Sequence, residues 1–130
     1  MIEEYPRRLL REHKSEASAG GTYDDVEFPE VPHGEQWWVQ EVAATDEDNA
    51  CTKIGVFIKT RYGNHWINER AFTTAAERRR LECKCWVGEN ERLVVRFTGA
   101  TSADVLRAWL TGTYEEIGEQ VGAPTRFGGM

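Results

Sequence analysis

Apolar and polar residues alternate along much of the chain after its first quarter. The stretch 34–44 is rich in aromatic and β-branched residues, and 51–60 places Ile54, Val56 and Ile58 at every second position. A two-residue period puts alternate side chains on the same side of an extended backbone. Both stretches therefore predict strands, and the second is expected to be buried on one face.

Turn-forming residues divide the next part of the chain into short segments. The turn Arg-Tyr-Gly-Asn separates 51–60 from a strand expected at 65–70, so the two predict a hairpin. After a longer connection at 71–77, two more strands are expected at 79–87 and 92–99, joined by the turn Gly-Glu-Asn-Glu. Their inward faces are expected to carry Leu81, Cys83, Cys85 and Val87 on the first strand, and Leu93, Val95 and Phe97 on the second.

The segment 101–122 fits two structures. A possible cap at Ser102 and the helical spacing of the apolar residues that follow favour a helix. The strand interpretation instead places Leu106, Ala108 and Leu110 on one face. The short strands upstream, with a turn about every eight to twelve residues, are typical of a sandwich or barrel. The pattern alone leaves helix and strand nearly even.

The N-terminal residues differ from the rest of the chain. Residues 5–16 allow a short helix with Pro6 in its first turn, and the polar, glycine-containing residues 17–25 are typical of a linker. Residues 26–32 are held extended by two prolines. Segments of this type are either frayed or ordered on a neighbouring subunit, and the sequence favours neither.

This pattern predicts three parts of the chain. We expect an N-terminal arm at residues 1–33, a β-sandwich body at 34–117 and a C-terminal tail at 118–130. The expected fold class is all-β, an antiparallel sandwich with an extended N-terminal arm.

Composition and charge narrow the class of protein. A chain of 130 residues that is 40% hydrophobic and 29% charged suits one domain with its own core. The net charge of −6 argues against a general nucleic-acid binder, which needs a basic face. No apolar stretch reaches the length of a membrane span, and the first residues lack the apolar segment of a secretory signal. We therefore expect an intracellular origin, with neither nucleic acid nor membrane as partner.

The chain shows no recognisable catalytic or metal motif. Its three cysteines, Cys51, Cys83 and Cys85, have the spacing of no familiar zinc site, so buried free thiols are expected. The acidic run 45–49 contains carboxylates that suit calcium, but it lacks the glycine and distal glutamate of a calcium loop. A solvated acidic loop is the favoured interpretation. We predict a protein that is not an enzyme and has no cofactor.

The tryptophans are the best candidates for binding a partner. Trp37 and Trp38 are adjacent, so one of them must point away from the core of a sheet, and Trp86 is expected on an outward face. Exposed aromatic rings suit either sugar rings or a neighbouring protein subunit. The candidate partner-binding residues, in the arm and on these strands, are Tyr5, Leu9, Leu10, Trp37, Trp38 and Trp86.

The order of segments from residue 31 to 116 resembles a group of small virion proteins of tailed bacteriophages. The likeness is carried by Val-Pro-His-Gly-Glu-Gln-Trp-Trp-Val at 31–39, a polar loop with Asp and Asn, the spacing Gly-x-x-x-x-Asp at 99–104 and Gly-Thr-Tyr at 112–114. The chain departs from this group in its turn Gly-Glu-Asn-Glu, where the group has Pro-Gly, and in its three cysteines.

The resemblance implies a jelly-roll β-sandwich, a final strand at 103–112, and a structural place in the virion after synthesis in the host cytoplasm. The implied function is a capsid decoration protein or a minor head or tail protein that stabilises the shell. The implied partners are the major capsid protein or another virion protein, together with further copies of this chain, a trimer being expected. A carbohydrate-binding or host-attachment module is the alternative.

Overall fold

The computed structural model describes residues 6–71 and 74–117, and eight strands make up most of these segments. Within them, no helix is long and apolar enough to cross a membrane. The strands are β1 (Arg8–Ala17), β2 (Tyr23–Glu27), β3 (Glu35–Asp46), β4 (Lys53–Thr60), β5 (Gly63–Ala71), β6 (Arg79–Val87), β7 (Arg92–Thr98) and β8 (Val105–Glu116).

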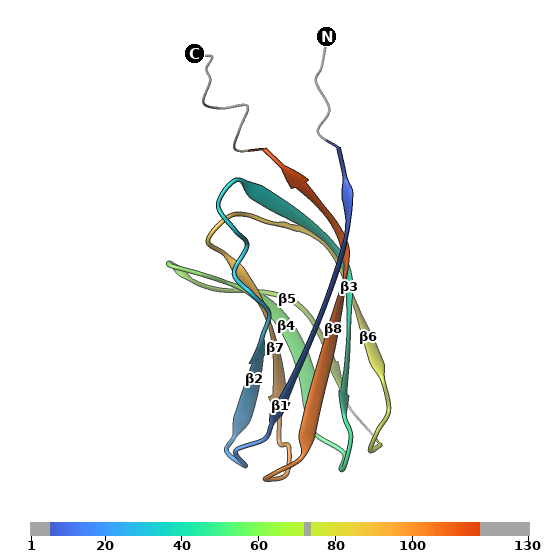
Figure 1. The fold of residues 1–130 in the computed structure, drawn as a ribbon. Helices are drawn as coiled ribbons and strands as arrows, with labels where there is room; N and C mark the ends of the chain where they lie inside the picture. Colours follow the sequence, from blue (N-terminus) through green and yellow to red (C-terminus); the bar gives the residue numbers. More distant parts are fainter. Residues whose placement is uncertain (1–5, 72–73, 118–130) are drawn as a thin grey trace, which may run out of the picture.

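The strands form two antiparallel sheets that face each other (Figure 1). One sheet has the order β1-β8-β3-β6 and the other β2-β7-β4-β5. Only the β4–β5 hairpin joins two strands of one sheet, so every other connection crosses from sheet to sheet. The antiparallel β-sandwich expected from the sequence is confirmed, while the narrower jelly-roll assignment stays a prediction.

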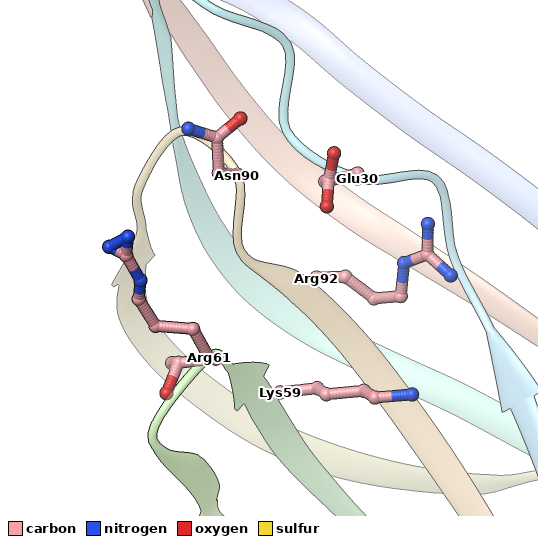
Figure 2. A pocket seen from close by; sticks show the side chains of 6 residues that line it. Glu30, Lys59, Arg61, Asn90 and Arg92 are labelled. Carbon is pink, nitrogen blue, oxygen red and sulfur yellow. The ribbon is translucent and has the colours of Figure 1, made fainter.

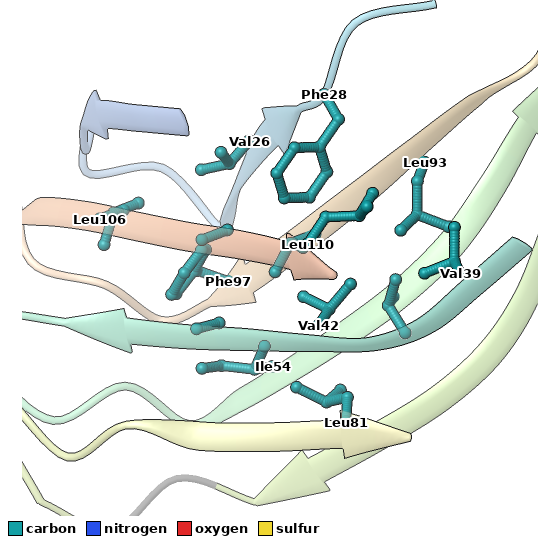
Figure 3. Packing of buried hydrophobic residues seen from close by; sticks show 14 of the residues in the cluster. Val26, Phe28, Val39, Val42, Ile54, Leu81, Leu93, Phe97, Leu106 and Leu110 are labelled. Carbon is teal, nitrogen blue, oxygen red and sulfur yellow. The ribbon is translucent and has the colours of Figure 1, made fainter. Parts of the chain in front are cut away.

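The core lies between the two sheets and receives alternate side chains from both (Figure 3). Leu106 and Leu110 of one sheet point into the same space as Phe97 and Ile54 of the other. All four side chains are fully buried. Burying an aliphatic or aromatic side chain of this size stabilises the fold by about 1.5–3 kcal/mol, so this shared layer is what holds the sheets together.

Most strands expected from the body are confirmed. Residues 53–60 and 63–71 form the predicted hairpin, and the inward residues of β7 are those that alternation indicated. Residues 105–116 form a strand, with Leu106, Ala108 and Leu110 buried on one face. The strand forms despite its helical spacing because β8 lies between β1 and β3 and pairs with both.

Residues 8–33 do not form the separate arm expected from the sequence. Instead of a short helix, β1 pairs with β8 over ten residues, and part of the expected linker is β2, which pairs with β7. Phe28 and Val31 beyond β2 are also buried, and their backbone N–H groups donate to the carbonyl oxygens of Leu93 and Glu91. These residues are part of the sandwich, whereas the expected tail at 118–130 lies outside the described residues.

The sequence of β1 lacks the apolar–polar alternation that predicts a strand, because β1 lies at the edge of its sheet. Of the side chains on its inner side, only Leu10 is buried. Glu12, Lys14 and Glu16 follow on the same side but lie beyond the core. Charged residues that point inward on an edge strand oppose pairing with another chain. The tertiary pairing with β8 therefore decides the structure here, and local propensity does not.

The cysteines are free thiols, and all three face the interior to different depths. Cys51 is buried, whereas Cys83 and Cys85 are only partly buried and pack against the core from β6. The sequence predicts buried thiols, which is correct for Cys51 and only partly so for Cys83 and Cys85, because β6 is an edge strand that the opposite sheet covers incompletely. Burial still raises the pKa of Cys51 to about 11 and of Cys83 to about 12.

Candidate binding surfaces

An apolar row crosses the outer face of the β1-β8-β3-β6 sheet. Leu9 of β1 lies opposite Thr113 of β8, which lies opposite Trp38 of β3, which in turn lies opposite Trp86 of β6. Directly opposed residues of antiparallel strands point to the same side of the sheet. The four residues, here called the outer row, therefore form one line across all four strands.

The two ends of the outer row are exposed, Thr113 and Trp38 between them are half-buried, and the rings are held in a fixed arrangement. Leu9 is 65% exposed and Trp86 is 42% exposed. The ring of Trp86 meets that of Trp38 edge-on with 5.2 Å between ring centroids, a geometry that stabilises aromatic pairs. Arg7 reaches over the face to within 5.7 Å of the Trp86 ring centroid and pairs with Glu115 at 3.0 Å. The row thus offers rigid apolar surface beside paired charges.

The structure brings together three of the six residues singled out from the sequence. Leu9, Trp38 and Trp86 belong to the outer row. Leu10 and Trp37 are buried in the core, so their expected role in binding a partner is wrong. They point inward because they alternate with Leu9 and Trp38 along β1 and β3. Tyr5 lies outside the described residues.

A second cluster, built around an arginine, lies on the outer face of the β2-β7-β4-β5 sheet. The guanidinium of Arg96 lies 3.7 Å from the ring centroid of Tyr23, 5.1 Å from that of Phe57 and 5.5 Å from that of Trp66. Asp25 accepts two hydrogen bonds from Arg96, at 2.8 and 2.9 Å. These contacts fix the guanidinium plane and neutralise its charge.

Two aromatic rings of this cluster border a hollow of about 230 Å³. Tyr23 is 49% exposed and Trp66 is 47% exposed, and Arg96 lies between β2 and β4 at the base. Lys53 and Glu69, which pair at 3.8 Å, contribute charged groups to the lining. A Cβ added at Gly55 would lie 2.7 Å from the Trp66 ring, so the glycine allows this ring to lie across β4.

Sequence reasoning missed this hollow. Tyr23 was assigned to a linker, and Trp66 was noted only as part of a strand. The sequence did contain a signal for Trp66. The other face of its hairpin is apolar, so an aromatic residue at this position is expected to point outward. The sequence contains no signal for the contact between Tyr23 and Arg96, because this contact depends on the pairing of β2 with β7.

A polar pocket of about 310 Å³ lies at the end of the sandwich near the β4–β5 turn. Figure 2 shows Lys59 and Arg92 extending to one side of it and Arg61 to the other. Lys59 and Arg92 both pair with Glu27, at 3.2 and 2.6 Å, and the hydrogen bond from Arg92 holds the pKa of Glu27 below its usual range. Glu27 offsets one of the two positive charges that it pairs with, and Glu30, which also lines the pocket, offsets another, so the pocket offers little net charge to an anion.

The acidic run 45–49 is solvated only in part, since residues 47–49 are exposed as expected from the sequence, whereas Thr45 and Asp46 are buried. Asp46 is fully buried at the end of β3, where one of its carboxylate oxygens lies close to one from Asp104. Burial raises the pKa of Asp46 to about 6, and a hydrogen bond with Asp104 adds to the effect. Burial also raises the pKa of Asp104, but hydrogen bonds with Asp46, Asn49 and the Thr101 N–H outweigh it and lower that pKa.

Comparison with known proteins leaves the function open. The sequence matches no protein-family model, and no curated protein matches it. Many solved structures are similar in part, and the three described below each have a TM-score below 0.5. PirA is 10% identical over 85% of this chain and 96% of its own, with a TM-score of 0.46.

The Drosophila NLP core, described for pentamer formation and histone binding, is 14% identical over 81% of this chain and 97% of its own, with a TM-score of 0.41. A family 29 carbohydrate-binding module is 8% identical over 83% of this chain and 92% of its own, with a TM-score of 0.40. At these values none of the three bears on the partner or the activity of this chain.

Proposed function

We propose that this protein is a non-catalytic structural component that docks on neighbouring protein subunits through the outer row. The observation that carries the proposal is the alignment of Leu9, Trp38 and Trp86 in one line across four strands, with Leu9 and Trp86 exposed and Trp38 half-buried. Tryptophan is the residue most enriched at the energetic centres of protein interfaces. Apolar surface of this kind on a folded domain is typical of an interaction site.

The shape and charge of this face favour a protein partner. The row follows the surface of a sheet, and Arg7 and Glu115 beside it already neutralise each other. A protein interface combines such an apolar centre with a polar rim. A partner subunit with complementary apolar residues would bury both tryptophan rings without having to leave a charge unpaired.

The specific form of the proposal is a virion protein that decorates and stabilises a capsid. It is supported by the resemblance to small tailed-phage virion proteins over residues 31–116. On a repeating lattice, many weak contacts act together, so a small row on each copy is enough for firm attachment. Copies of this chain would also contact each other, with a trimer as the expected assembly.

The test compares attachment of matched variants to preformed, undecorated capsids. Trp86→Ser removes the exposed ring at the β6 end of the row, whereas Tyr62→Ser removes an aromatic ring that is 86% exposed at the β4–β5 turn. We expect Trp86→Ser to weaken attachment and self-association at least tenfold, measured by co-sedimentation and analytical ultracentrifugation, and Tyr62→Ser to leave both unchanged. Equal binding by both variants would contradict docking through the row.

The hollow between Tyr23 and Trp66 supports a second candidate, a glycan-binding module. Its two exposed rings can stack on the faces of a sugar, and Arg96, Lys53 and Glu69 can hydrogen-bond its hydroxyl groups. Sites for small ligands commonly combine apolar walls with a few polar groups in this way. The residues differ from the tryptophans that the sequence suggested for sugar stacking.

A glycan array followed by a tryptophan fluorescence titration tests the second candidate. If the hollow binds a sugar, a responding glycan should shift the emission of the native protein. Trp66→Ala should abolish binding of that glycan, whereas Trp86→Ser should retain it. No response from any glycan on the array would remove this candidate and leave docking through the outer row untouched.

A further inference from the structure

Three carboxylates lie close together at the end of the sandwich where β3 ends and β8 begins. Asp46 is the last residue of β3, Asp48 lies in the loop after it, and Asp104 immediately precedes β8. One carboxylate oxygen from each lies within 4.8 Å of the other two. Asp46 and Asp104 are buried, and Asp48 is exposed. The fold therefore gathers three acidic groups from two separate loops.

Hydrogen bonds hold these carboxylates in place without neutralising them. One oxygen of Asp46, Oδ1, accepts from the N–H groups of Asp48 and Asn49, at 3.1 and 3.2 Å. Asp104 accepts from the side-chain amide of Asn49 at 2.7 Å, and Asp48 from the N–H of Val105 at 2.8 Å. In residues 6–71 and 74–117, no lysine or arginine forms an ion pair with any of the three.

The remaining oxygen of Asp46 points to a missing ligand. Asp46 is fully buried, and its Oδ2 accepts no hydrogen bond from any described residue. A buried carboxylate oxygen without a donor is costly unless a cation or a proton satisfies it. The orphaned oxygen and the gathering of three carboxylates are separate observations, and both favour positive charge beside Asp46.

We propose that Asp46, Asp48 and Asp104 bind one divalent cation with the chemistry of Ca²⁺. Calcium takes oxygen ligands at about 2.3–2.6 Å in flexible geometries, so two ligand oxygens can lie up to about 5 Å apart. The spacing of the three carboxylates falls within this limit. Asp48 is exposed, so water can complete the coordination from its side. The bound cation would tie the β3–β4 loop to the β7–β8 loop.

The test measures calcium binding to protein first stripped with EDTA and then dialysed. We expect isothermal titration calorimetry to show one site, with a dissociation constant of about 0.1–1 mM, as for weak calcium sites. Since the ion binds only the folded state, 10 mM CaCl₂ should raise the thermal midpoint by roughly 5–10 °C. NaCl at the same ionic strength should not reproduce the rise.

Two variants separate a calcium site from a general effect of charge. Asp48→Asn removes one ligand charge but keeps an oxygen that can accept from the Val105 N–H, so the variant should fold and lose the calcium response. Glu16→Gln removes an exposed negative charge from β1 and should respond like the wild type. Absence of binding heat, or an equal calcium response in Asp48→Asn, would overturn the proposal and leave Asp46 and Asp104 sharing only a proton.

Discussion

The two outer faces of the sandwich both carry exposed aromatic rings, but they are built differently. On the β1-β8-β3-β6 sheet, Trp38 and Trp86 pack on each other in a row that continues to Leu9. On the β2-β7-β4-β5 sheet, Tyr23 and Trp66 are separated by Arg96 and border a hollow. A continuous apolar row suits a protein surface, and a polar hollow between two rings suits a small ligand.

The first face also depends more directly on the N-terminal residues. β1 supplies Leu9 to the outer row and Leu10 to the core. The hollow on the other face takes only Thr22 and Tyr23 from the N-terminal part of the chain. The two faces can therefore be perturbed separately, which makes the comparison between them testable.

The largest effect is expected from deleting residues 1–22. This removes β1, leaves the edge of β8 unpaired along ten residues and exposes the core around Leu10. The loss is expected to be comparable with the whole stability of a small domain, about 5–15 kcal/mol. Circular dichroism should show no cooperative thermal transition. A folded deletion variant with an unchanged midpoint would show that β1 is dispensable.

Gly112→Ala should be the most damaging single substitution in the sheet that carries the first face. A Cβ at Gly112 would collide with the carbonyl oxygen of Trp38, where the pairing of β3 and β8 shifts its register. Because backbone rather than a flexible side chain must move, we expect a loss of about 3 kcal/mol in urea unfolding. Gly21→Ala, which meets no atom within 4 Å, is the control and should change stability by less than about 0.5 kcal/mol.

Arg96→Met should perturb the second face by a smaller amount. The substitution removes the two hydrogen bonds to Asp25, both of whose partners are largely buried, and a loss of about 2 kcal/mol is expected. The emission of Trp66 should shift while self-association is retained. Lys53→Met breaks only an exposed pair at 3.8 Å and should cost less than about 1 kcal/mol. Equal losses from both substitutions would mean that Arg96 does not organise this face.

The last prediction leaves the fold unchanged and concerns how fast the cysteines, which lie on the interior side of the sheets, react with a thiol reagent. Burial raises the pKa of Cys51 to about 11 and of Cys83 to about 12, so little reactive thiolate is present near pH 7.5. A thiol reagent should label these residues at least about 100-fold more slowly in the native state than in denaturant. Fast native labelling of Cys51 would contradict its burial.

The sequence predicts the body of the fold well because its strands alternate strongly. β4, β6 and β7 were located by a two-residue period that follows from burial on one side. β1 was missed because Leu10 is its only deeply buried side chain, so an edge strand leaves almost no periodic signal. Its structure comes from pairing with residues about 100 positions away.

The candidate sites were predictable only in part for the same reason. Alternation placed Trp86 on an outward face and required one of Trp37 and Trp38 to point outward, but the alignment of Trp38 and Trp86 with Leu9 depends on the register of three strand pairs. Asp46 ends β3 and Asp104 precedes β8, far away in the sequence, so their contact has no local signature. Side-chain direction can be inferred from a single strand, whereas clusters across strands require the fold.

The most direct test of the account is an electron cryo-microscopy reconstruction of capsids decorated with this protein. If the outer row is the docking surface, the β1-β8-β3-β6 sheet should face the lattice, with Trp86 buried against a neighbouring subunit. The hollow beside Trp66 should then remain open to solvent. A reconstruction in which Trp86 faces solvent and the other sheet makes the contact would contradict the central claim.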